Sequence, residues 1–113
     1  IGAQIDELEV GYDHCYVFGS RSAATPVDIA EAYHPASGRV MEVSTTEPGV
    51  QLYSGWYLPG IAGKESAVYN RYAGFCFETQ HFPDGVNIPH FPNSVLRPGE
   101  TYRQTTEYRF SAR

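Results

Sequence analysis

The chain has 113 residues, of which 42% are hydrophobic and 14% aromatic, and this is enough apolar material for the core of one domain. The formal net charge is −5, and the basic residues occur singly, so there is no basic cluster to neutralise a row of phosphates. The apolar runs are only a few residues long, too short to span a bilayer. The composition therefore argues against global disorder, against nucleic acid as a partner and against a membrane partner.

The N-terminal segment Ile1–Val10 carries three acidic residues and lacks the basic start and apolar stretch of a signal peptide. The two cysteines, Cys15 and Cys76, lie far apart in apolar runs. One disulfide between them is an open alternative, but two reduced thiols buried in the core are the favoured interpretation. We therefore expect a protein of the cytoplasm.

Short runs of β-branched and aromatic residues, separated by 11 glycines and 8 prolines, predict an all-β domain, and helix signals are nearly absent. The expected strands are Tyr12–Phe18, Val27–Tyr33, Arg39–Thr45, Val50–Ser54, Phe75–Thr79 and Thr105–Phe110. In the last of these, alternation places Thr106, Tyr108 and Phe110 on one face and Glu107 and Arg109 on the other.

Two long stretches do not follow this pattern. Leu58–Tyr72 has no clear period, and Gln80–Gly99 combines prolines and glycines with polar and aromatic residues. Loops of this length are uncommon in compact domains unless they serve a function such as a binding rim. The strand runs are apolar, and the chain has a single lysine, Lys64, to blunt a sheet edge. This suggests that the edges are covered by something outside this sequence.

Three polar residues, Asp13, Gln51 and Glu78, stand in apolar strand contexts. Each has an ordinary interpretation as well: a local cap or pair for Asp13, a rim position for Gln51, and a solvent-facing carboxylate for Glu78. Glu78 is the hardest to explain in this way, because Phe75, Cys76 and Phe77 directly precede it. A carboxylate desolvated by such neighbours would have a raised pKa and could serve as a general base.

Several motifs surround these positions in chain order. They are Gly11-Tyr12-Asp13-His14, Ser37-Gly38-Arg39-Val40-Met41-Glu42-Val43, Thr45-Thr46-Glu47-Pro48-Gly49-Val50-Gln51-Leu52-Tyr53-Ser54-Gly55, Gly74-Phe75-Cys76-Phe77-Glu78-Thr79-Gln80 and Leu96-Arg97-Pro98-Gly99-Glu100-Thr101-Tyr102. Together they resemble the galactose mutarotase (aldose 1-epimerase) family from about Gly11 to the end of the chain. The resemblance implies an antiparallel β-sandwich, the galactose mutarotase-like supersandwich, with this chain as the C-terminal portion of a single domain.

The resemblance also implies a function. Enzymes of this family interconvert the α and β anomers of aldohexoses such as galactose and glucose by acid–base ring opening, without a cofactor. The family's catalytic base, the Glu of its Glu-Thr-Gln motif, falls on Glu78. Its two sugar-binding residues in the matched motifs fall on Asp13 and Gln51. The family's acid histidine would precede Ile1, so we expect an upstream N-terminal fragment or chain as a partner and an aldohexose as the substrate.

None of the four histidines, His14, His34, His81 and His90, corresponds to that acid. A structural role is expected for His14, and positions at the rim of the site are expected for His81 and His90. Trp56 stands where similar proteins usually have Asn, and it could alter the edge of the site or add a stacking surface for a sugar ring.

We expect neither a metal nor an organic cofactor, because no cysteines and histidines have ligand spacing and no glycine-rich phosphate loop precedes a helix. The alternative function is a non-catalytic carbohydrate-binding or regulatory module of the same fold. The lack of the acid histidine supports that alternative, whereas the joint presence of Asp13, Gln51 and Glu78 argues against it. A small β domain of unrelated function is a third interpretation, which the collinear motifs disfavour.

Overall fold

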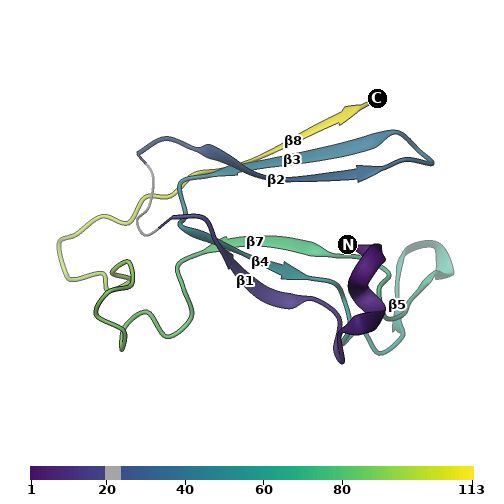
Figure 1. Ribbon diagram of the computed structural model, residues 1–113, viewed down its shortest axis with the longest axis horizontal. Coiled ribbons are helices and arrows are strands. Elements are labelled where there is room, and N and C mark those ends of the chain that lie inside the picture. The colour runs from purple at the N-terminus through teal and green to yellow at the C-terminus, as the bar shows by residue number, and fades with distance from the viewer. Residues whose placement is uncertain (20–23) are drawn as a thin grey trace. The chain divides into compact units, whose positions relative to one another are not determined.

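The computed structural model describes residues 1–19 and 24–113. Its elements in chain order are η1 (Gly2–Glu7), β1 (Asp13–Val17), β2 (Val27–His34), β3 (Arg39–Thr45), β4 (Gly49–Tyr53), β5 (Ile61–Ala62), η2 (Lys64–Ser66), β6 (Val68–Tyr69), β7 (Cys76–Gln80) and β8 (Thr106–Ala112) (Figure 1). The two helices are short 3-10 turns, and no helix of the described residues is long and apolar enough to cross a membrane. The expected all-β class with antiparallel sheets is confirmed.

All the expected strands are present, and their ends differ from the expected ones by no more than two residues. The stretch Leu58–Tyr72, expected to be irregular, contains a small hairpin in which Ile61 pairs with Tyr69. The 3-10 helix η1 has no counterpart among the expected elements. It has no buried residue and no side-chain cap, which explains why no amphipathic pattern predicted it.

The chain divides into two compact units. Unit 1 comprises Ile1–Tyr16 and Gln51–Glu78, and unit 2 comprises Val17–Val50 and Thr79–Arg113. The strands β1, β4 and β7 form one sheet in the order β1-β4-β7, and each of them passes from one unit into the other. Backbone hydrogen bonds from Ser54 N to Tyr12 O (2.9 Å) and from Phe18 N to Pro48 O (3.2 Å) border the β1–β4 pair, which is antiparallel.

The second sheet, in the order β2-β3-β8, lies within unit 2 and is antiparallel throughout (Figure 1). Tyr108 is paired with Val43 and Arg109 with Glu42, so the apolar and charged faces alternate along β8 as expected. Val43 is fully buried, whereas Tyr108 and Phe110 are 46% and 73% exposed. The apolar face of this sheet is therefore open towards its β8 edge.

The most deeply buried part of the chain is the stretch from Val43 to Val50, in which every residue is buried. This stretch ends β3 and begins β4, and it includes one charged residue, Glu47, which is 5% exposed. A buried carboxylate is costly unless it is paired or hydrogen-bonded. The partners of Glu47 are therefore part of the explanation of the fold.

The two cysteines are less buried than expected. Cys15 is half-buried, and Cys76 is an exposed free thiol. The expectation of a buried thiol at position 76 is wrong, because the side chains of β7 alternate and Phe77 takes the half-buried position between exposed neighbours.

Candidate functional site

Two of the three predicted site residues are in direct contact. Asp13 is the first residue of β1, Gln51 is the central residue of β4, and the two strands are neighbours in one sheet. The side-chain amide of Gln51 donates a hydrogen bond from Nε2 to Oδ1 of Asp13, at 2.7 Å. Asp13 has a second carboxylate oxygen and Gln51 an amide carbonyl, and both are acceptors for sugar hydroxyls. The pair is therefore suited to holding a polyhydroxylated ligand.

The backbone before Asp13 is fixed by Ser54, which is 2% exposed. Tyr12 N donates to Ser54 Oγ at 2.9 Å, and Ser54 N donates to Tyr12 O at 2.9 Å. Gly11 has a φ of +66°, and a Cβ at this position would lie 2.6 Å from Ser54 Oγ. Only glycine fits there, and it allows β1 to begin close against the end of β4. Asp13 N donates to Nδ1 of His14 at 3.1 Å.

Glu78 lies in the middle of β7, the strand that neighbours β4. Its side chain is exposed, and the adjacent Phe77 is half-buried. The rings of Phe75 and Phe77 pack edge to face with each other at 5.4 Å between centroids. The expected desolvation of Glu78 by its aromatic neighbours is therefore not present in this segment, because alternation directs Glu78 and Phe77 to opposite sides of the strand. The carboxylate is accessible to a ligand instead.

Trp56 follows the end of β4 in unit 1 and is half-buried. The guanidinium carbon of Arg71 lies 4.0 Å from the centroid of the Trp56 ring, and the Tyr72 ring lies at 5.7 Å in a tilted arrangement. This is a cation–π contact that covers one face of the indole. Of the two ring faces, at most one is available for a sugar.

A second cluster, within unit 2, was not identified as a site from the sequence. Glu47 Oε2 lies 2.7 Å from His81 Nδ1, and Tyr102 donates its hydroxyl proton to Glu47 Oε1 at 2.6 Å. The hydrogen bond to Glu47, assisted by burial and by the negative charge of Glu47, raises the pKa of Tyr102 to about 12. Oε2 of Glu47 is buried and has no hydrogen-bond partner among the described residues, so its contact with His81 is a close approach of a carboxylate oxygen to an imidazole nitrogen.

The side chain of His81 is 17% exposed and lies against the buried Glu47. Its expected position at the rim of the sugar site stays a prediction. The cluster lines a cavity of about 570 Å³, together with Asn93–Leu96 and Thr101–Gln104. Glu47 and Tyr102 were not identified as site residues from the sequence. For Glu47 the reason is that a Glu between threonines and a proline is usually a surface residue. The one available signal is that Glu47 is a charged residue in the short connection between the predicted strands Arg39–Thr45 and Val50–Ser54.

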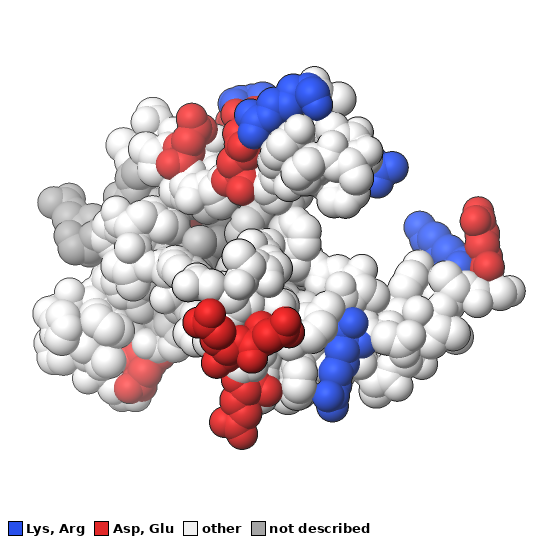
Figure 2. Space-filling view, turned by 45° about the vertical axis from the view of Figure 1, so that its right-hand side comes forward, with Lys and Arg blue, Asp and Glu red and all other residues white. Residues whose placement is uncertain are grey.

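The charges of the described residues indicate no other kind of site. On the face shown in Figure 2, the Lys and Arg side chains do not merge into one broad basic surface. Among residues 1–19 and 24–113, no group of three or more His, Cys, Asp or Glu side chains is placed to hold a metal ion. Two polar arrangements therefore remain among the described residues: Asp13 and Gln51, with Glu78 on the neighbouring strand, and the cluster around Glu47.

Comparison with known proteins identifies the class. The sequence profile described as "Aldose 1-epimerase" matches residues 2–109, nearly the whole chain. The chain belongs to the aldose 1-epimerase family.

Individual relatives agree with this assignment. The chain is 50% identical to the galactose mutarotase of Homo sapiens over 114 residues, which cover 98% of this chain and 32% of that protein. It is 43% identical to the galactose mutarotase of Mus musculus, with the same coverage. It is 34% identical to the aldose 1-epimerase of Escherichia coli (strain K12), over 97% of this chain and 32% of that protein. The chain therefore spans about a third of the length of the curated relatives it matches.

Proposed function

We propose that this chain is the C-terminal portion of an aldose 1-epimerase that interconverts the α and β anomers of aldohexoses such as galactose and glucose. The observation that carries the proposal is the placement of Asp13, Gln51 and Glu78 on three successive strands of one sheet, with Asp13 and Gln51 hydrogen-bonded to each other. Membership of the family, and the name galactose mutarotase borne by several relatives, support the reaction and the substrate class.

In the proposed mechanism, Glu78 accepts the proton of the anomeric hydroxyl of the sugar. The C1–O1 bond gains carbonyl character while the bond between C1 and the ring oxygen breaks, and the ring oxygen takes a proton from an acid. Rotation about the C1–C2 bond and reversal of the same steps give the other anomer. Asp13 and Gln51 hold the sugar hydroxyls, so that the anomeric hydroxyl meets Glu78. Such acid–base assistance contributes about a hundredfold or more for each positioned group.

The acid is proposed to come from a part of the protein outside this segment, which spans a third of the relatives' length. The open apolar face at Tyr108 and Phe110 gives that part a surface on which to pack. Proton transfer to and from a hemiacetal requires neither a metal nor an organic cofactor, and none is proposed. An exposed free thiol at Cys76 suits the reducing conditions of the cytoplasm, which is the proposed location.

The test is the substitution Glu78→Gln in the full-length protein. It keeps the shape of the side chain and removes the proton acceptor, so we expect kcat to fall by at least about a hundredfold. Polarimetry of freshly dissolved α-D-galactose or α-D-glucose measures the rate after subtraction of spontaneous mutarotation. Glu107→Gln is the matched control, because Glu107 is an exposed carboxylate in β8 outside the site, and it should keep the full rate. A folded Glu78→Gln protein with the unmutated rate would exclude Glu78 as the base.

The alternative of a non-catalytic carbohydrate-binding or regulatory module is favoured by one observation, the exposure of Glu78 in this segment. A general base of this kind usually has surroundings that bring its pKa nearer to neutrality. The alternative predicts that the unmutated full-length protein binds galactose in calorimetry but shows no rate above the spontaneous one. The enzyme proposal predicts both binding and an accelerated rate.

A further inference from the structure

The strand that carries Glu78 is tied down immediately after this residue by a chain of hydroxyl groups. Thr79 Oγ1 lies 2.7 Å from Thr106 Oγ1, which lies 2.9 Å from Thr45 Oγ1. Thr45 is fully buried and ends β3, and Thr106 begins β8. One residue after Glu78, β7 is therefore hydrogen-bonded to the first residue of β8, which is in turn hydrogen-bonded to the last residue of β3.

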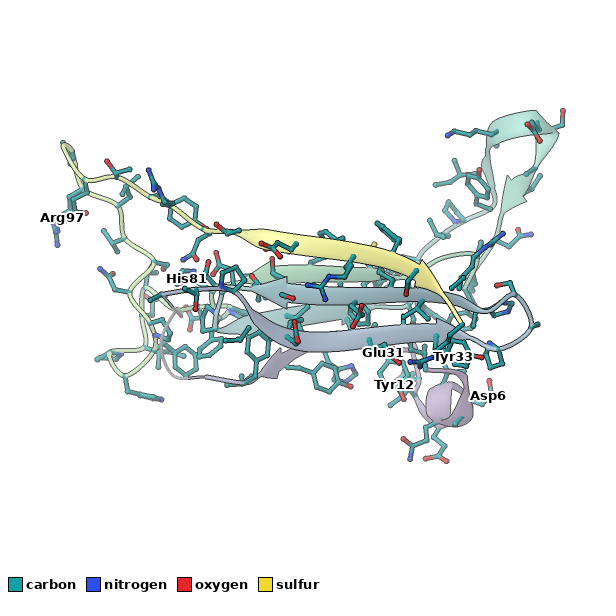
Figure 3. The ribbon with its side chains drawn as sticks, turned by 90° about the horizontal axis from the view of Figure 1, so that it is seen from above. Asp6, Tyr12, Glu31, Tyr33, His81 and Arg97 are labelled. Atoms are coloured by element: carbon teal, nitrogen blue, oxygen red, sulfur yellow. The ribbon has the colours of Figure 1, made fainter. Side chains whose placement is uncertain are left out.

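Three residues after Glu78, the chain is held a second time. His81 directly follows β7 (Figure 3). Its Nδ1 lies 2.7 Å from Oε2 of the buried Glu47, whose Oε1 accepts the hydroxyl proton of Tyr102. Glu47 N in turn donates to Thr45 Oγ1 at 3.1 Å, so the two sets of bonds share Thr45. Glu47 also stands two residues before β4, the strand that carries Gln51.

We propose that these groups form a positioning device for catalysis, which we call the strand anchor. Its members are Thr45, Glu47, Thr79, His81, Tyr102 and Thr106. The inference rests on the proposed function and deepens it, because it assigns to these residues the placement of Glu78 along β7 relative to Gln51 on β4. None of them is proposed to touch the sugar.

The choice of chemistry supports a positioning role over simple core packing. Apolar contacts hold a strand in the core but tolerate small shifts along it, whereas hydrogen bonds weaken steeply with distance and angle. Buried hydroxyl groups specify one arrangement when they are hydrogen-bonded to one another, as those of Thr45, Thr79 and Thr106 are here. A displacement of about 1 Å in a reacting group can cost about a hundredfold in rate. Loss of the anchor should therefore reduce turnover before it prevents folding.

The test uses two substitutions in the full-length protein that preserve shape. Thr79→Val replaces a hydroxyl by a methyl group, and Glu47→Gln removes the charge while keeping an acceptor for Tyr102. We expect kcat for aldohexose mutarotation to fall by about tenfold in each variant, with KM changed by less than about twofold. The control is Glu31→Gln. Glu31 lies on β2, far from His81 in Figure 3, and forms an exposed ion pair with Arg113. This variant should keep the unmutated kcat.

A purely structural role is separated from a positioning role by repeating both substitutions in the Glu78→Gln background. If the anchor acts through Glu78, the second substitution should lower the residual rate by less than about twofold, because the group being positioned is already absent. An undiminished tenfold loss in that background, or an unchanged kcat in the single variants of an active protein, would overturn the anchor while leaving the proposed function intact.

An unmutated protein with no rate above the spontaneous one would instead overturn the proposed function. Amide hydrogen exchange of β7 in the full-length protein then tests the proposal of the strand anchor. Exchange of the β7 amides that is at least about tenfold faster in Thr79→Val than in the unmutated protein would support the anchor as a device that holds this strand. Equal exchange in the two proteins would exclude it.

Discussion

Two carboxylates of this chain have opposite surroundings. Glu47 is 5% exposed and is held by an imidazole and a phenol, whereas Glu78 is exposed in the middle of a strand. In the first, Oε1 accepts the hydroxyl proton of Tyr102, whereas the buried Oε2 lies 2.7 Å from His81 Nδ1 without a hydrogen bond in the described residues. The second carries the proposed chemistry and is open to a ligand. The comparison teaches that the polar groups that organise the fold and those proposed to act on the ligand can be separate sets. The two sets meet on β7, which carries Thr79 of the strand anchor next to Glu78.

The largest effect that tests this comparison concerns the 113-residue segment by itself. We expect the isolated segment to associate or to lack a cooperative thermal transition, because Tyr108 and Phe110 leave an apolar sheet face open. Size-exclusion chromatography and circular dichroism would measure this, with the full-length protein as the reference. A sharply monomeric, cooperatively melting segment would show that the surroundings of Glu78 need nothing from the rest of the protein.

A smaller effect compares the buried carboxylate of Glu47 with the exposed carboxylate of Glu31, which forms an ion pair with Arg113. Glu47→Ala leaves the imidazole of His81 and the hydroxyl of Tyr102 without their acceptor, so we expect a loss of about 3 kcal/mol in the free energy of unfolding. Glu31→Ala breaks the exposed pair with Arg113 and should cost less than about 1 kcal/mol. Urea denaturation of the full-length variants measures both. Equal losses would mean that burial of Glu47 has no energetic consequence.

Asp13 and Gln51 belong with Glu78 to the groups that are proposed to act on the ligand. Asp13→Asn and Gln51→Ala each remove part of the pair that is proposed to hold the sugar. We expect KM to rise by about fivefold to tenfold, the effect of losing one or two hydrogen bonds to a ligand, while stability changes by less than about 1 kcal/mol. Initial rates over a range of galactose concentrations would show it. A change in stability without a change in KM would place Asp13 and Gln51 among the structural groups instead.

The smallest expected effect is a shift in the titration of Tyr102. Its pKa of about 12 in the folded protein exceeds the ordinary value of 10.0, chiefly because its hydroxyl proton is held by Glu47. The stability contributed by this bond is therefore present below about pH 10 and is lost as the pH rises towards 12. The tyrosinate absorbance of the unmutated protein minus that of Tyr102→Phe should titrate near pH 12. In the Glu47→Gln background, the same difference should titrate closer to pH 10.

The strands were predictable from the sequence because turn residues and β-branched runs mark them locally. Arg39–Thr45 has the expected bounds, and the alternation of β8 has the expected faces. The contact between Asp13 and Gln51 was anticipated only as a shared role, since strand pairing across 38 positions leaves no local signal. The motifs identified Asp13 and Gln51 as candidates, and the pairing of β1 with β4 places the two side chains in contact.

The sequence alone did not predict that Glu47 is buried and Glu78 exposed, and the reason is physical. Glu78 has Phe, Cys and Phe before it, but in a strand immediate neighbours point to the opposite face, so they do not bury it. Glu47 has Thr and Pro beside it, and its partners His81 and Tyr102 come from 34 and 55 positions further along the chain. Such compensation depends on tertiary contacts that no local pattern contains.

The exposed thiol of Cys76 has a practical consequence. Cys76 and Glu78 are two residues apart on β7, so their side chains leave the strand on the same side. A thiol-directed reagent applied to the full-length protein would thus attach close to the proposed base without any engineered cysteine. The alkylation rate at this position, measured by mass spectrometry with and without galactose, would report ligand occupancy even in variants that no longer turn over.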